Sequence, residues 1–139
     1  GLMGFGAMIF AAFLAACAST GGKAPRMGEM LANATGQNGR ACVRQSDIRG
    51  YGVLKGDVIS IDGSRAYYLA TVLPGCNDLR TSVASIFNGG FGEICGGGMD
   101  SLATSGGDRC LINKIYKFVS REQALAVHKE AFDKREALK

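Results

Sequence analysis

The sequence predicts a mainly β fold: a small antiparallel curled sheet or barrel with a short internal helix, a C-terminal amphipathic helix and two disulfides. Three observations support this prediction. From residue 41 onward, short runs rich in β-branched and aromatic residues alternate with glycine-containing turns. The chain has 21 glycines and no tryptophan, a composition that favours tight turns between short strands. Four of the five cysteines lie in the same region, as in small exported domains.

The N-terminal stretch has the layout of a secretory signal. Residues 1–13 are uncharged and mostly apolar, and the small residues typical of a cleavage site follow them. The sequence Leu-Ala-Ala-Cys, which ends at Cys17, resembles the lipobox of bacterial lipoproteins. The resemblance implies that residues 1–16 are a signal peptide, and that Cys17 receives a lipid and becomes the first mature residue. No Lys or Arg precedes the apolar run, so we expect the sequence to begin inside the signal peptide.

Two other interpretations of this stretch stay open. One is a transmembrane helix, but that needs about 20 apolar residues, and polar residues 19–23 interrupt the run sooner. The other is a plain signal peptide with an incidental cysteine. In lipoproteins of this kind, Asp after the cysteine commonly marks retention in the inner membrane, and here the residue is Ala18. We therefore expect a lipid anchor in the outer membrane, with the protein facing the periplasm.

Residues 17–40 are predicted to be a flexible, lipidated tether. They are rich in small and polar side chains, and residues 33–39 contain several helix breakers, so this segment has little to bury. Met27, Met30 and Leu31 would share one side of a brief helical turn, but such a turn alone is unstable in water.

The predicted β domain spans residues 41–119. Its first strands are expected at residues 50–54, 58–61 and 65–73, and the two Gly-containing turns between them indicate an antiparallel meander. The third run is almost continuously apolar or aromatic, which is typical of a central strand covered on both faces. Further strands are expected at residues 93–95, 101–104 and 110–118.

A short internal helix is predicted after Cys76. The apolar residues there recur at i, i+4, i+7 and i+8, the spacing of one helical face. They are Leu79, Val83, Ile86 and Phe87. Either Asn77 or Asp78 would serve as the N-cap.

Residues 120–139 carry the clearest helix signal. Ser120 and Gln123 have the spacing of a capping box. Apolar residues follow at helical spacing and define one face. They are Ala124, Leu125, Val127, Ala131, Phe132 and Leu138. We expect this face to pack on the protein's own sheet rather than on a partner or a membrane.

Four cysteines remain when Cys17 is set aside, and they predict two disulfides in an oxidising compartment. They are Cys42, Cys76, Cys95 and Cys110. A zinc site is disfavoured because no C-x2-C pair is present. We expect the pairs Cys42 with Cys110 and Cys76 with Cys95, because first and last strands often meet when a sheet curls closed. The sequential pairing, Cys42 with Cys76 and Cys95 with Cys110, stays open.

The charge pattern and motifs limit the possible functions. The net charge of +4 is mild and interspersed, which argues against nucleic acid as a partner. The glycine clusters complete neither G-x-G-x-x-G nor a P-loop, and the single histidine, His128, reads as a hydrogen-bonded packing residue. We therefore predict no enzyme activity, no cofactor and no metal. The candidate ligand-binding residues are Asp78, Arg80, Asp100 and Arg109, because the disulfides would draw their segments together.

The spacing of the cysteines and their neighbours resembles an uncharacterised family of proteobacterial lipoproteins of unknown function. The resemblance covers residues 41–118 and rests on short motifs around the four cysteines. They include Cys42-Val43-Arg44, Gly75-Cys76-Asn77-Asp78-Leu79 and Arg109-Cys110-Leu111-Ile112. It implies an exported location and a shared fold, and it transfers no activity. The leading hypothesis is a non-catalytic envelope lipoprotein that acts as a binding or assembly module, possible partners being other envelope proteins. The alternative is an envelope enzyme or enzyme inhibitor.

Overall fold

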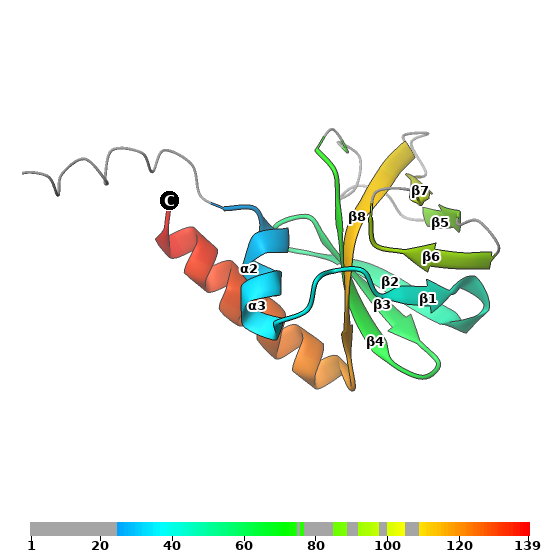
Figure 1. Cartoon of the computed structure of the whole chain (residues 1–139), viewed down its shortest axis with the longest axis horizontal. Helices are drawn as coiled ribbons and strands as arrows, with labels where there is room; N and C mark the ends of the chain where they lie inside the picture. Colours follow the sequence, from blue (N-terminus) through cyan, green and yellow to red (C-terminus); the bar gives the residue numbers. More distant parts are fainter. Residues whose placement is uncertain (1–24, 75, 77–84, 89–91, 98–99, 105–108) are drawn as a thin grey trace, which may run out of the picture.

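A six-stranded antiparallel sheet in the order β2-β3-β4-β8-β7-β5 forms the centre of the protein. Two helices pack on one face, and a two-stranded ribbon of β1 and β6 packs on the other (Figure 1). The structure is a computed structural model that describes residues 25–74, 76, 85–88, 92–97, 100–104 and 109–139. The helices are α2 (Met27–Thr35) and α3 (Arg121–Ala137), and a 3-10 turn, η3 (Gln45–Asp47), follows β1. The strands are β1 (Cys42–Arg44), β2 (Ile48–Leu54), β3 (Val58–Gly63), β4 (Tyr67–Val72), β5 (Ser85–Asn88), β6 (Glu93–Cys95), β7 (Ser101–Thr104) and β8 (Arg109–Phe118).

The mainly β class and the predicted meander are confirmed, since β3 pairs with β2 on one side and with β4 on the other. β4 is covered on both faces, as its apolar run predicts. Tyr67 and Leu69 pack among the helices, whereas Tyr68 and Ala70 pack in the opposite core. Successive side chains of a strand point to opposite faces, so a continuous apolar run supplies both cores at once.

β8 joins the two halves of the curled sheet. Its residues from Ile112 to Phe118 pair with β4, and its first residues pair with β7. The opposite edge of its second half is covered by the segment that follows α2. Gly39 O accepts from Ile115 N at 2.8 Å, and the Gln37 amide side chain bonds both the N–H and the C=O of Lys117. This segment therefore protects an edge that would otherwise be open to pairing with another chain.

The predicted internal helix is wrong where the structure describes it. Ile86 and Phe87 lie in β5, paired with Ala103 and Leu102 of β7. Apolar residues at helical spacing do not by themselves exclude a short strand, and β7 supplies backbone partners along one edge of this segment. The other residues of the expected helical face, Leu79 and Val83, lie outside the described residues, as do both suggested N-caps.

The predicted tether extends too far along the chain. Residues 27–35 of it form α2, and Met27, Met30 and Leu31 are buried among the residues of β4, β8 and α3. One helical turn is unstable alone, but the sheet and α3 supply the apolar surface that it needs. Gly36, at φ 74°, ends the helix and donates its N–H to Ala32 O at 2.8 Å.

α3 follows its sequence signals closely. Ser120 Oγ accepts from Gln123 N at 3.1 Å, and Gln123 Oε1 accepts from Val119 N, one residue before the position expected in a capping box. Ala124 and Ala131 are buried against the sheet side, which confirms packing on the protein's own core. Leu138 is 58% exposed, because it lies at the C-cap beyond the last buried turn. No helix in the described ranges is long and apolar enough to cross a membrane.

The two predicted disulfides are present, but the expected connectivity and the sequential alternative are both wrong. Cys42 bonds Cys95, and Cys76 bonds Cys110. The first strand does not meet the last one at a sheet edge. Instead, β1 pairs with β6 in the register that places Cys42 directly opposite Cys95, while β8 lies in the middle of the sheet beside β4.

Candidate functional site

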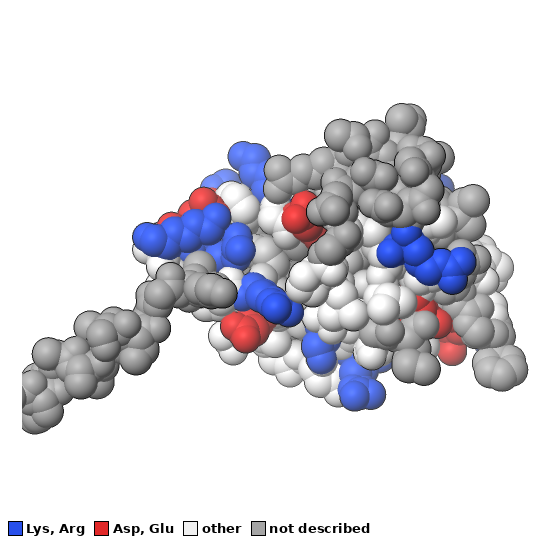
Figure 2. All heavy atoms as spheres, turned by 90° about the horizontal axis from the view of Figure 1, so that it is seen from above, with Lys and Arg blue, Asp and Glu red and all other residues white. Residues whose placement is uncertain are grey.

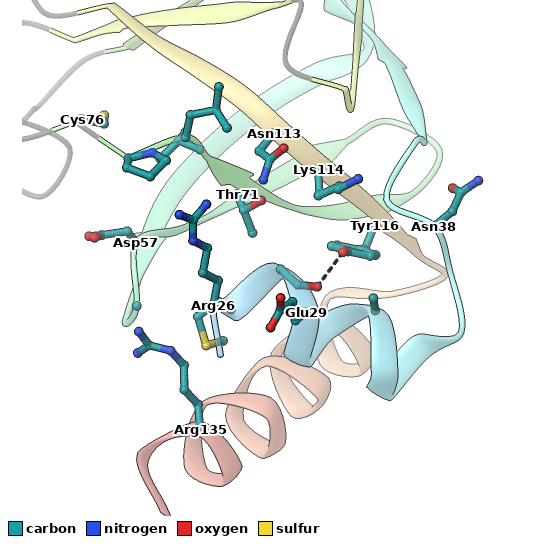
Figure 3. A pocket seen from close by; sticks show the side chains of 17 residues that line it. Arg26, Glu29, Asn38, Asp57, Thr71, Cys76, Asn113, Lys114, Tyr116 and Arg135 are labelled. Carbon is teal, nitrogen blue, oxygen red and sulfur yellow. Dashed lines mark hydrogen bonds between the residues drawn. The ribbon is translucent and has the colours of Figure 1, made fainter. Parts of the chain in front are cut away.

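A cavity of about 500 Å³ lies where the first turn of α2 crosses the end of β4 and the middle of β8 (Figure 3). That volume is in the range of small-molecule sites. Three parts of the chain form its walls: the start of α2, the segment from Thr71 to Pro74 with Cys76, and the middle of β8. Arg135 of α3 and the β2–β3 turn complete the rim.

A β-bulge shapes the β8 wall. Thr71 pairs with Lys114, but the next residue, Val72, pairs with Ile112, so Asn113 is an extra residue on β8. The bulge interrupts the alternation of side chains, and both Asn113 and Lys114 line the cavity in consequence. The Lys114 stem lies directly over Gly39, because a Cβ at that glycine would come 2.6 Å from Lys114 Cδ.

The floor of the cavity contains a buried hydroxyl group. Thr71 is 6% exposed, and its Oγ1 has no hydrogen-bond partner within the described part of the chain. The oxygen faces α2, since a Cβ built on Gly28 would lie 3.7 Å from it. An unsatisfied buried polar group typically costs about 1 to 3 kcal/mol, and such groups in native structures usually have a functional reason.

Tyr116 holds the helix over this floor. Its ring is almost fully buried, and its hydroxyl donates to Gly28 O at 2.7 Å (Figure 3). Burial raises the pKa of the Tyr116 phenol above its usual value. The hydrogen bond fixes the first turn of α2 relative to β8, and so it fixes the roof of the cavity relative to its floor.

We expect Tyr116→Phe to lower the free energy of unfolding by about 1 kcal/mol, because it removes this hydrogen bond and little volume.

The raised pKa of Tyr116 also predicts that the stability of the protein depends on pH. Stability from the neutral phenol is fully present below pH about 10, where the unfolded tyrosine is also neutral, and is lost as the pH rises through the raised value. Urea unfolding between pH 7 and 11 should show a smaller alkaline loss in Tyr116→Phe than in the wild type. An identical loss in both proteins would contradict this assignment.

The cavity carries more cations than carboxylates. Arg26, Lys114 and Arg135 line it, together with Glu29 and Asp57. Within the described residues, neither Arg26 nor Lys114 forms an ion pair, whereas Arg135 Nε donates to Pro25 O at 2.7 Å. Elsewhere, on the face drawn in Figure 2, basic side chains stand in small separate groups, with acidic ones beside some of them.

A second hollow of about 740 Å³ lies near the end of β8. Arg40, Arg65 and Lys117 line it, with Phe118 and Val119. The three cations that line it are exposed to solvent. The one buried polar atom without a partner in the described ranges, Thr71 Oγ1, lines the cavity under α2 and not this hollow. The cavity under α2 is therefore the stronger candidate.

Of the four sequence-based ligand residues, the two that the structure describes, Asp100 and Arg109, do not line this cavity. Asp100 instead supports the β6 end, since its carboxylate accepts from Cys95 N at 2.7 Å. Arg109 is exposed at the start of β8. Asp78, Arg80 and the predicted lipidation site Cys17 lie outside the described residues.

His128 agrees with its prediction. It is 8% exposed, its Nε2 lies 2.8 Å from Lys55 O, and its ring stacks on Phe132 with 6.1 Å between centroids. The histidine thus connects α3 to the turn after β2. Glu93 lies near Cys42 and Cys95 in a grouping that resembles a metal-ligand set. Because the two sulfurs are bonded to each other, they are not available as thiolate ligands.

Sequence reasoning missed the cavity residues, although two signals were present. Thr71 is the one polar side chain of β4 that is not aromatic. Asn113 and Lys114 are consecutive polar residues inside an alternating strand, and this break in alternation coincides with the bulge.

The fold and the cavity define a small, disulfide-linked antiparallel β domain with a helix-roofed cavity of ligand-binding size. The chain belongs to the Family of unknown function (DUF6491), whose model matches residues 2–135. No curated protein and no solved structure matches it.

Proposed function

We propose that this protein is a non-catalytic binding module of the cell envelope that holds a small molecule in the cavity beneath α2. The observation that carries the proposal is the buried Thr71 hydroxyl, which lines the cavity and finds no partner in the described residues. A bound ligand would supply that partner. Gly28 supports this function, because it leaves open the space between the helix and the hydroxyl.

Gly28→Ala tests the proposal. The added methyl group would lie in ordinary contact, 3.7 Å from Thr71 Oγ1 and 3.8 Å from Lys114 Cγ, so it narrows the cavity without a clash. Alanine in a helix is favoured over glycine by up to about 1 kcal/mol, so the variant should be at least as stable as the wild type. The fluorescent probe N-phenyl-1-naphthylamine, which is neutral and apolar, should bind the wild type at one site and bind Gly28→Ala at least tenfold more weakly.

Gly50→Ala is the matched control, because a methyl group there meets nothing within 4 Å and the position is remote from the cavity. It should bind the probe like the wild type. Equal affinity in Gly28→Ala and Gly50→Ala, or no binding to any of the three proteins, would overturn the proposal.

The proposal places the module on a membrane through lipid on Cys17. The support is the apolar run, small residues and cysteine at the N-terminus. Cys17→Ser should keep the leader uncleaved by lipoprotein signal peptidase and abolish incorporation of labelled palmitate. In a host with two membranes, the wild type should fractionate with the outer membrane. Palmitate labelling of the Cys17→Ser variant would refute lipidation at Cys17. Fractionation of the wild type with the inner membrane would refute the outer-membrane location.

An envelope enzyme or enzyme inhibitor is the alternative, and a capture experiment separates the two. Lipidated protein isolated from envelope extracts under native conditions should carry a small molecule that Gly28→Ala lacks. A captured molecule that is chemically altered over time would favour the enzyme instead.

A further inference from the structure

We infer that the ligand of this cavity is an amphiphile whose anionic group, a carboxylate or a phosphate, binds at the start of α2 between Arg26 and Lys114. This inference rests on the proposed function and adds the chemical class of the ligand. Four features of the cavity support it: the helix start, the buried Thr71 hydroxyl, the two cations and the apolar wall.

The first turn of α2 is an uncapped helix start. Arg26 is the N-cap residue, and its side chain makes no capping hydrogen bond. The helix is nine residues long, and the amides of Met27 and Gly28, which open it, have no carbonyl partner within the helix. Both residues line the cavity. A helix start of this kind favours negative charge through its free N–H groups and its dipole.

The Thr71 hydroxyl is the second donor, and it points to a ligand independently of the helix. It is more than nine-tenths buried, it has no partner in the described residues, and it faces Gly28 in the same turn. An oxyanion between the helix start and β4 would accept from this hydroxyl and from the free amides together. Each contact would be a charge-assisted hydrogen bond, the stronger class.

Arg26 and Lys114 flank the start of α2 on its two sides in Figure 3, with the Lys114 ammonium directed toward Asn38. Neither is paired with a carboxylate in the described part. Asp57 also lines the cavity, but its carboxylate points away from Arg26 and Lys114 in that view. Glu29 lines the cavity as well and lies on the Tyr116 side of the helix. The carboxylate restricts the anionic position to the Arg26 side. It also disfavours ligands with several negative charges.

The remaining wall is apolar. Val72, Leu73 and Pro74 form one side of the cavity, and Met27 lies opposite. An inorganic anion alone would leave this surface in water. A ligand with an apolar part beside its anionic group would bury it, at about 25 cal/mol per Å² of apolar area.

The position of the cavity relative to Cys17 is consistent with a membrane source. α2 begins at Met27, and Pro25, the first described residue, is eight positions after Cys17. Eight positions of fully extended chain span at most about 29 Å. If Cys17 carries the lipid, Arg26 therefore stays within about 35 Å of the membrane surface. Both a lipid head group and a free amphiphile would meet the cavity there.

The experiment measures displacement of N-phenyl-1-naphthylamine from the purified protein by four octyl compounds: octanoate, octyl phosphate, octanol and octylammonium. The two anions should compete at least tenfold better than octanol, and octylammonium should be the weakest. Arg26→Gln and Lys114→Gln should each reduce competition by the anions at least fivefold and leave octanol unchanged. Arg121→Gln, which removes a cation that does not line the cavity, should behave like the wild type.

The outcomes separate this inference from the proposed function. If octanol competes as well as the anions and both glutamine variants leave all four compounds unchanged, the anionic class is wrong while the cavity still binds ligands. If the probe itself does not bind, the proposed function fails first.

A parallel experiment with lipid vesicles identifies the source of the ligand. If phosphatidylglycerol vesicles displace the probe and phosphatidylcholine vesicles do not, the ligand is a membrane lipid. Displacement by free octanoate or octyl phosphate without any effect of vesicles indicates a soluble ligand.

Discussion

Gly96→Ala is expected to destabilise the protein by about 3 to 5 kcal/mol, a large part of the 5 to 15 kcal/mol typical of a folded domain. The reason is a close crossing of three backbone segments. A Cβ at Gly96 would overlap Gly39 O and lie 2.8 Å from Ile115 N. These two atoms form the hydrogen bond that ties the segment after α2 to the edge of β8.

Relief of this overlap requires backbone movement, because no flexible side chain is involved. Gly96 N also donates to Ala41 O at 3.0 Å, so movement at Gly96 would disturb β1 as well. Urea unfolding gives the measurement. Gly50→Ala, where a methyl group meets no atom within 4 Å, should change the free energy of unfolding by no more than about 0.5 kcal/mol. Equal stability of the two variants would contradict the crossing.

Removal of either disulfide is expected to cost about 4 kcal/mol. The bond between Cys76 and Cys110 closes a loop with a sequence separation of 34, and the bond between Cys42 and Cys95 closes one of 53. The loss of loop-closure entropy in the unfolded chain grows only with the logarithm of loop length, so the two values are nearly equal. The double alanine variants Cys76→Ala/Cys110→Ala and Cys42→Ala/Cys95→Ala should therefore shift the urea midpoint alike.

Their response to reductant should differ. Cys110 is 2% exposed and lies in the core, whereas Cys42 is exposed. Dithiothreitol under native conditions should open the Cys42–Cys95 bond first, because thiol exchange requires access to a sulfur atom. Peptide mapping without reduction checks the pairing itself. A peptide that joins Cys95 to Cys110 would contradict the structure, and preferential opening of the Cys76–Cys110 bond would contradict the order of reduction.

Local patterns alone were sufficient for most elements of this fold. The apolar run of β4, the Gly-containing turns on either side of β3 and the Ser120 cap of α3 are properties of neighbouring residues, and each element formed where those residues predicted it. The involvement of all four cysteines in disulfides also follows from their number and spacing.

Strand order and everything that depends on it were decided by tertiary structure. β8 inserts beside β4, so Cys110 meets Cys76, and Cys42 meets Cys95 across β1 and β6. β5 is a strand because β7 pairs with it.

The same holds for α2, which is too short to be stable alone and forms because β8 and α3 bury its apolar face. The cavity could be predicted from the sequence even less than α2, because it requires several long-range contacts at once. It requires α2 over β4, the bulge at Asn113, and Arg26 and Lys114 in one lining although they stand 88 positions apart in the sequence. The sequence determined α3 and most of the strands, because their signals depend on neighbours along the chain. Only packing between distant segments decided which side chains meet, because long-range pairing leaves no local pattern.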